Sequence, residues 1–304
     1  MTKKNIFYKV IYGLLLFFLV VAAGAGAWEL SKPYRTTVIA GYLQQADRLV
    51  KKNDSMALWE LEKAYFMGLD YPSYRQERAI LLLELNDARA TDELDWLVAQ
   101  GWANDRVNFE EGRLAFLNKE YEVAWQYFGQ MSKDSDPQDQ GQALVMMAVM
   151  AGDEGNWSGV NDYLRQAGNK NYRSDLSLQL ELALNIVLAD WEQIDKMTNW
   201  SSWGDDEEQL RVQVLALESL VGDTYFIQSA QVLTDMGWPG WARAYLSNVD
   251  GTTLDQKDLY QVYAYTYLAG RDCGEALSYV KMAEQIDSTD LDTQKLLESI
   301  NQCL

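Results

Sequence analysis

A helical unit of about 34 residues recurs along this chain, and no other feature constrains the fold as strongly. The clearest copy is EGRLAFLNKEYEVAWQYF at residues 111–128, and a second lies at residues 263–287. In the first copy Gly112 and Ala115 recur at helical spacing, and Tyr121 opens the second helix. Small residues let two helices approach closely, and aromatic side chains fill the space beside them. A fixed period of this length is typical of a stacked solenoid, so we expect an all-α fold.

Helical periodicity continues along nearly all of the chain after residue 37. Short polar loops separate the apolar-periodic segments, which predicts antiparallel neighbours. No segment alternates with period two, so no sheet is expected. The expected helix pairs are 38–51 with 55–67, 73–85 with 90–100, 108–117 with 121–131, 142–151 with 157–167, 176–188 with 191–197, 207–220 with 225–236, and 259–269 with 274–286. A short extra helix at 241–246 interrupts the period, and 289–303 forms a polar capping helix.

Equivalent positions of the second helices recur with steps of 33 to 36 residues. They are Ala57, Ala90, Ala124, Val160, Ile194 and Ile227. This regularity resembles the tetratricopeptide repeat family, most closely at residues 111–131 and 263–286. The chain departs from the family pattern at Arg78, Leu182 and Leu215, where a small residue is expected. The resemblance implies a right-handed α-solenoid of about seven hairpins over residues 38–304.

The resemblance also implies a concave groove, lined by the first helix of each pair, for peptides or partner domains. The candidate contacts on these faces are Phe109, Arg113, Phe116, Gln142, Val145, Val149, Gln261, Tyr265 and Leu268. A packed or solvated position for any of them is the alternative. Family members that bind chaperone tails use paired Lys and Asn residues, and only Arg113 resembles that pattern. We therefore infer no chaperone-tail site.

An uncharged run of 18 residues, 10–27, follows three lysines near the N-terminus. As a helix it spans about 27 Å, close to the hydrocarbon thickness of a bilayer. Trp28 and Tyr8 stand where interfacial aromatic residues are expected. We expect a transmembrane anchor over residues 1–27. The alternative is a cleaved signal peptide, because residues 25–27 read Ala-Gly-Ala.

Both interpretations send the rest of the chain across the membrane, because the three lysines favour the cytoplasmic side. A linker around Pro33 is expected at residues 28–37, followed by the solenoid at 38–304. Lys32 and Arg35 weaken this orientation without reversing it. The expected location is the cytoplasmic membrane, with a single pass and an extracytoplasmic C-terminal domain. The alternative is a regulator facing the cytoplasm, which reduced cysteines would favour.

The two cysteines support the exported topology. Cys273 opens one expected helix and Cys303 ends the next, and the turn between the helices lies midway between them. Antiparallel helices would bring both residues to the same end, within reach of a disulfide. Disulfides persist in oxidising compartments, so we expect this pair to be bonded. Two unrelated thiols are the alternative.

The chain carries 45 acidic and 26 basic residues, a net charge of −19. Such a surface repels nucleic acid, whereas a basic protein segment fits it well. There is no histidine, which removes the commonest metal ligand and general base. No phosphate-binding loop, nucleophile elbow or metal-spaced set occurs. No catalytic, cofactor or metal site is therefore expected.

Eleven tryptophans could suggest a ligand cage, but helix packing explains most of them better. The ones expected in the core include Trp59, Trp96, Trp125, Trp157, Trp191 and Trp241. Trp200 and Trp203 differ, because they precede the acidic run at residues 205–208 in a predicted loop. These two are further candidate partner contacts.

These patterns predict a membrane-tethered, non-catalytic scaffold or adaptor that binds protein or peptide partners through the groove. The oligomeric state is left open. The alternative from another class is a glycan-binding protein or a carboxylate enzyme of the cell envelope. Its candidate acids, chosen by composition alone, are Asp92, Glu93, Glu110, Glu111 and residues 205–208.

Overall fold

The computed structural model describes residues 31–68, 71–198, 208–220, 222–248 and 254–304. The expected membrane segment at residues 1–27 lies outside these ranges, and so do Trp200 and Trp203. Within the described ranges, no helix combines the length and the apolar character needed to cross a bilayer. The tether and its orientation therefore stay predictions.

The described residues form α-helices and contain no strand, which confirms the expected all-α class. The chain divides into two compact units, Met1–Glu111 (unit 1) and Gly112–Leu304 (unit 2). The boundary falls inside one helix, α6 (Asp105–Leu117).

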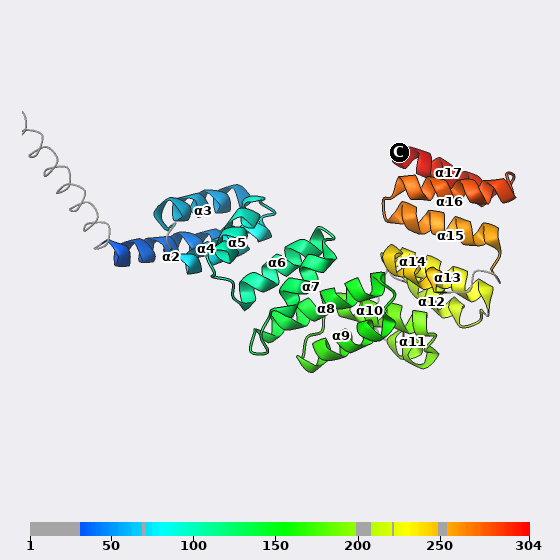
Figure 1. Cartoon of the computed structure of the whole chain (residues 1–304), viewed down its shortest axis with the longest axis horizontal. Coiled ribbons are helices and arrows are strands. Elements are labelled where there is room, and N and C mark those ends of the chain that lie inside the picture. Colours follow the sequence, from blue (N-terminus) through cyan, green and yellow to red (C-terminus); the bar gives the residue numbers. More distant parts are fainter. Residues whose placement is uncertain (1–30, 69–70, 199–207, 221, 249–253) are drawn as a thin grey trace, which may run out of the picture. The chain divides into compact units, whose positions relative to one another are not determined.

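Unit 1 consists of consecutive helical hairpins, which Figure 1 shows at the blue end of the colour bar. Its helices before α6 are α2 (Lys32–Leu49), α3 (Asp54–Gly68), α4 (Pro72–Glu84) and α5 (Arg89–Ala99). α2 packs on α3, and α4 packs on α5. The pairing follows the predicted order.

The start of α2 corrects the expected linker, because residues 32–37 are helical. Pro33 lies in the first turn of this helix. The first N–H groups of a helix have no partner within the helix, so proline loses nothing there. The same residue would break a helix only in its interior.

The apolar core of the first hairpin is built from large and small side chains in alternation. Ile39 and Leu43 on α2 are buried against Ala57 and Leu61 on α3. The alanines keep the two backbones close, as the repeat pattern predicts. Each leucine that is buried completely contributes about 2 kcal/mol of hydrophobic stabilisation.

A buried cluster of charges joins α3, α4 and α5. Arg78, which stands where the repeat expects a small residue, is buried and donates to Glu93 at 2.5 Å. Its guanidinium also lies 3.6 Å from Glu62 and stacks on the ring of Tyr65. Arg75 lies 3.3 Å from Glu93 on the other side. The departure at Arg78 is therefore an ion pair that replaces small-residue packing.

Unit 2 continues from α6 with eleven further helices in its described ranges. They are α7 (Tyr121–Gly129), α8 (Pro137–Asp153), α9 (Trp157–Asn169), α10 (Asp175–Leu188), α11 (Trp191–Thr198), α12 (Glu208–Leu217), α13 (Asp223–Asp235), α14 (Pro239–Ser247), α15 (Gln256–Ala269), α16 (Cys273–Ile286) and α17 (Leu291–Cys303). α8 starts five residues earlier than predicted. Asp136 caps it by accepting from the N–H of Gln138, and Pro137 lies in its first turn.

One contact in unit 2 breaks the rule that a solenoid helix meets only its neighbours. The short helix α14 packs on α8 as well as on α13 and α15. Trp241 of α14 is completely buried, and its indole N–H donates to the carbonyl of Val149 at 3.0 Å. Trp157 meets the same ring edge-to-face. The irregular helix therefore closes the main core of unit 2.

Gly152 makes this closure possible. A Cβ atom built at Gly152 would lie 1.9 Å from the indole of Trp241, so no other residue fits there. A Cβ at Gly240 would lie 2.0 Å from a carboxylate oxygen of Asp153, so that side chain would have to shift. Asp153 in turn accepts from the hydroxyl of Tyr121 at 2.8 Å.

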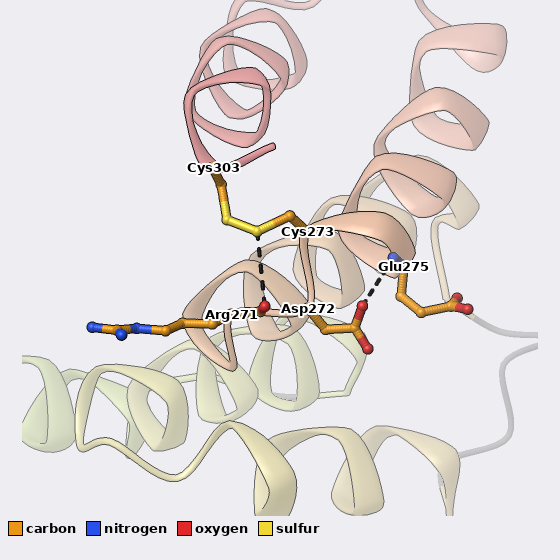
Figure 2. The surroundings of a disulfide bond; sticks show 5 residues. All are labelled: Arg271, Asp272, Cys273, Glu275 and Cys303. Atoms are coloured by element: carbon orange, nitrogen blue, oxygen red, sulfur yellow. Dashed lines mark hydrogen bonds between the residues drawn. A yellow bond between two sulfur atoms is a disulfide. The ribbon is translucent and has the colours of Figure 1, made fainter.

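The last three helices, α15, α16 and α17, pack in sequence at the red end of the colour bar in Figure 1. Tyr279 stacks between Tyr263 and Tyr267. Cys273 and Cys303 form the expected disulfide, with Cα atoms 6.0 Å apart, and Figure 2 shows the bond joining the end of α17 to the start of α16. Asp272 caps α16 by accepting from the N–H of Glu275 (Figure 2).

Candidate functional site

Three of the predicted groove residues are core residues instead of surface contacts. Phe109, Val145 and Val149 are buried. Val145 and Val149 lie in the core cluster that Trp241 completes. For Val145 and Val149, packing of α14 on α8 is the physical reason, because α14 occupies a face of α8 that a regular solenoid would leave open.

Three more predicted contacts are half-buried and engaged within the fold. Phe116 stacks on Tyr121, with ring centroids 6.0 Å apart. Leu268 packs against the core of the last hairpin. Gln261 donates from Nε2 to Asp290 at 2.6 Å and to Thr293 at 2.7 Å, which ties α15 to α17. The side chains at these three positions therefore make contacts within the fold.

Tyr265 also has an internal partner, because its hydroxyl donates to Asp235 at 2.5 Å. Burial, followed by the hydrogen bond to this carboxylate, raises the pKa of Tyr265 to about 12. Arg113 and Gln142 are half-buried, and nothing in the structure tests them as partner contacts.

A different groove opens in unit 2 between α9, α10 and α11, with a volume of about 590 Å³. This size falls within the range of roughly 300–1,000 Å³ that is typical of small-ligand sites. Its lining residues are Asn161, Leu164, Arg165, Arg173, Glu181, Leu184, Asn185, Gln193, Lys196 and Met197. We call this opening the α9–α11 groove.

Three consecutive helices, α9, α10 and α11, supply nearly all of the lining residues. The floor of the groove is apolar, since Leu164 and Leu184 are buried there. Asn185 lies on the same floor, 3.3 Å from the sulfur of Met197.

The rim of the α9–α11 groove is positive, although unit 2 is acidic. Arg165, Arg173 and Lys196 line it, and Glu181 is the only acidic lining residue. Two rim cations have exposed partners of their own, because Arg165 lies 3.0 Å from Asp162 and Lys196 lies 2.7 Å from Glu192.

Exposed pairs of this kind contribute only about 0–1 kcal/mol, so the rim cations can exchange these partners for a ligand. Glu181 lies deeper than the rim, and burial raises its pKa. The nearby Arg173 opposes that shift.

This arrangement can bind a segment that is both apolar and acidic. The leucine floor takes apolar side chains, and the two arginines and the lysine attract carboxylates. The amides of Asn161 and Gln193 add donors and acceptors for a peptide backbone. Within the described ranges, no cluster of Cys, Asp and Glu could hold a metal ion.

The sequence analysis did not predict the α9–α11 groove, because it expected groove contacts only on the first helix of each pair. Here second helices, α9 and α11, form both walls. One signal was available, since Asn161 and Arg165 are four residues apart and share a helix face.

The candidate carboxylates of the enzymatic alternative are mostly closed off from solvent. Glu93 and Glu110 are buried and paired, with Arg78 and Arg106 respectively. Glu111 is buried, and desolvation together with the charge of Asp95 raises its pKa to about 7. Residues 205–207 lie outside the described residues. A substrate has no access to the three buried glutamates, so they do not form an open acid–base site.

No family model and no curated protein sequence matches this chain. The similar solved structures include the following three. A tetratricopeptide repeat protein from Parabacteroides merdae is 13% identical, with a TM-score of 0.46, over 87% of this chain and 99% of its own. Pseudomonas aeruginosa pilF is 14% identical, with a TM-score of 0.39, over 87% of this chain and 98% of its own. The TPR domain of P58(IPK) is 14% identical, with a TM-score of 0.28, over the same shares.

These identities and TM-scores are too low to assign a family, a partner or an activity to the chain. The family resemblance continues to rest on the repeats in the sequence.

Proposed function

We propose that this chain is a membrane-tethered, non-catalytic scaffold that binds a protein partner in the α9–α11 groove. The observation that carries the proposal is the groove itself, with an apolar floor and a rim of three cations. The partner segment is amphipathic and carries acidic side chains opposite Arg165, Arg173 and Lys196. The tether is residues 10–27, whose uncharged length suits a bilayer.

A basic partner remains a prediction for the rest of unit 2. This unit holds 30 acidic and 13 basic residues, so its field attracts cations at long range. The groove is a local exception to that field. A partner with an acidic anchoring segment and a basic body would match both features.

The extracytoplasmic location of unit 2 is also part of the proposal. The disulfide between Cys273 and Cys303 supports it, because such bonds persist outside reducing compartments. Maleimide labelling of intact cells tests the location. Labelling that requires prior reduction supports an exported domain, whereas free thiols that react only after permeabilisation place it in the cytoplasm.

Site-specific photo-crosslinking tests the groove. A photoreactive residue replaces Gln193, which is exposed on the rim, and a control replaces Gln285, which is exposed on α16. We expect a discrete adduct from position 193 and none from position 285. The double variant Arg165→Glu/Arg173→Glu should reduce the adduct tenfold or more, while Lys281→Glu on α16 should retain it.

Adducts of equal yield from both positions would contradict the proposal, and so would an adduct insensitive to the arginine reversal. Both arginines are exposed, so their replacement leaves the core intact. Circular dichroism of each variant checks this point.

A further inference from the structure

An exposed apolar stripe runs along α3 in unit 1. Met56, Trp59 and Phe66 are 49%, 63% and 76% exposed. Residues spaced by three, seven and ten positions lie on one face of an α-helix. From Met56 to Phe66 the stripe is about 15 Å long, at 1.5 Å per residue. We call these three residues, with Lys63 between them, the α3 stripe.

Lys63 belongs to the stripe through its stem and its charge. Its ammonium lies 5.6 Å from the ring centroid of Trp59 and 5.4 Å from that of Tyr42. It also pairs with Glu60 at 2.7 Å. A lysine in such a position can bury its methylene stem in an apolar layer while its head group reaches water.

The stripe carries no exposed acid, in a chain with 45 acidic residues. Glu60 is buried beside Lys63. Glu62 is partly covered and pairs with Arg89 and Arg78. Asp54 is exposed, but it stands at the start of α3, two residues before Met56 and so on another face of the helix, where it accepts from the N–H of Lys51. An acid-free, aromatic surface is what an anionic membrane interface requires of a neighbouring helix.

The stripe lies on the hairpin that is nearest in sequence to the expected tether. α2 starts at Lys32, after only residues 28–31, and α3 runs beside α2 with a short turn between them (Figure 1). An antiparallel hairpin brings the end of α3, with Phe66, to the start of α2. There Tyr34 is 70% exposed, so exposed aromatic residues gather at the start of α2.

We infer that the α3 stripe is a membrane-surface site, with α3 lying in the plane of the lipid interface. Tryptophan and tyrosine prefer the headgroup level of a bilayer, and lysine flanks such helices. A helix that offers an apolar face and a lysine to solvent has the composition of an interfacial helix. The site goes beyond the tether, because it fixes the orientation of unit 1 on the bilayer.

Spin labelling of the full-length chain tests this site. A nitroxide is attached to Phe66→Cys, and the control carries it at Trp102→Cys, a 55% exposed residue of the same unit. The native cysteines are paired, so the new thiol is the one labelled. The chain is reconstituted in vesicles of phosphatidylcholine and phosphatidylglycerol, and collisions with oxygen and with a water-soluble nickel chelate are measured.

We expect the label at position 66 to collide more with oxygen and at least threefold less with the nickel chelate than the label at position 102. Equal nickel accessibility at the two positions overturns the site. Dipolar coupling between labels at position 66 overturns it as well, since it would mean that a second copy covers the stripe.

Failure of the tether is distinguished by alkaline extraction of the same vesicles. A chain that resists extraction while its label at position 66 stays aqueous keeps the tether and refutes the site. A chain that is extracted, but whose label is shielded from nickel before extraction, keeps the site and refutes the tether.

A second variant tests the stripe itself. It combines Trp59→Ser and Phe66→Ser with a label at Met56→Cys. Nickel accessibility at position 56 should rise in this variant if the stripe holds the helix on lipid.

Discussion

The two units are built from the same kind of helical hairpin but are held together differently. Unit 1 is close to neutral, with 15 acidic and 13 basic residues, and has a buried charge cluster around Arg78. Unit 2 has a net charge of −17, and its core is closed by the aromatic contact of Trp241 on α8. The comparison shows that helical periodicity leaves the choice of core chemistry open.

The difference has consequences for function. In unit 1, Glu60 and Glu62 on α3 pair with Lys63 and Arg89, and the α3 stripe itself carries no exposed acid, which suits a lipid surface. Unit 2 places its acids outside and keeps three cations around one groove, which suits a protein partner.

The largest loss of stability is expected from Trp241→Ala, which removes a side chain from the core of unit 2. The substitution removes a completely buried ring and its hydrogen bond to Val149. We expect the free energy of unfolding to fall by about 3–5 kcal/mol, as for other buried aromatics. Chemical denaturation measures it. The matched control is Trp59→Ala on the α3 stripe, which should cost under about 1 kcal/mol in detergent because the ring is exposed. Equal costs would refute the assignment of the two rings.

Arg78→Ala is the corresponding test of unit 1. Glu93 would remain buried without this partner, which costs about 3–5 kcal/mol for a buried ion pair. The control is Arg165→Ala, which breaks an exposed pair with Asp162 and should change stability by less than about 1 kcal/mol. The pair Arg78→Met/Glu93→Leu should recover most of the loss. If the double variant does not recover the lost stability, Arg78 stabilises the fold through a contact other than the one with Glu93.

Removing the disulfide should have a somewhat smaller effect. Cys303→Ser opens a link between residues 30 positions apart, and the loss of that constraint on the unfolded chain costs about 3 kcal/mol. Differential scanning calorimetry with and without reductant measures this. Reductant should lower the melting temperature of the wild type to that of the variant and leave the variant unchanged.

Glu111→Gln gives the smallest effect, and the effect depends on pH. The pKa of Glu111 is raised to about 7, above its value of 4.5 in an unfolded chain. The unfolded state therefore releases its proton first, and stability falls as pH rises from 4.5 to 7. The loss reaches at most about 3 kcal/mol above pH 7. The variant should exceed the wild type in unfolding free energy at pH 8 and match it at pH 4. A variant with a lower free energy of unfolding than the wild type at pH 8 would contradict the assignment of Glu111 as a buried acid.

Local patterns predicted the helices well because each helix depends on residues within a few turns of it. The bounds at Tyr121, Trp157 and Trp191 agree with the structure to the residue. The two largest errors fall where proline lies in the first turn of a helix, at Pro33 and Pro137, because a proline in sequence marks either an end or a beginning.

The candidate site was much less accessible to prediction. Phe109, Val145 and Val149 have the periodicity of a groove face, but periodicity does not tell which neighbour covers a face. Trp59, expected in the core, is exposed for the same reason. The α9–α11 groove depends on how α9, α10 and α11 pack together, which is a relation between helices rather than a property of any one of them.

The sequence by itself determined the helical class, the order of the hairpins and the pairing of Cys273 with Cys303. These features follow from spacing within about 35 residues, over which backbone geometry is nearly regular. Only the tertiary structure decided which faces are covered. The contact between Trp241 and Val149 spans 92 residues, and the burial of Arg78 with Glu93 depends on helices packing together. Burial is a property of the assembled helices, because each side chain is covered by residues that no local pattern specifies.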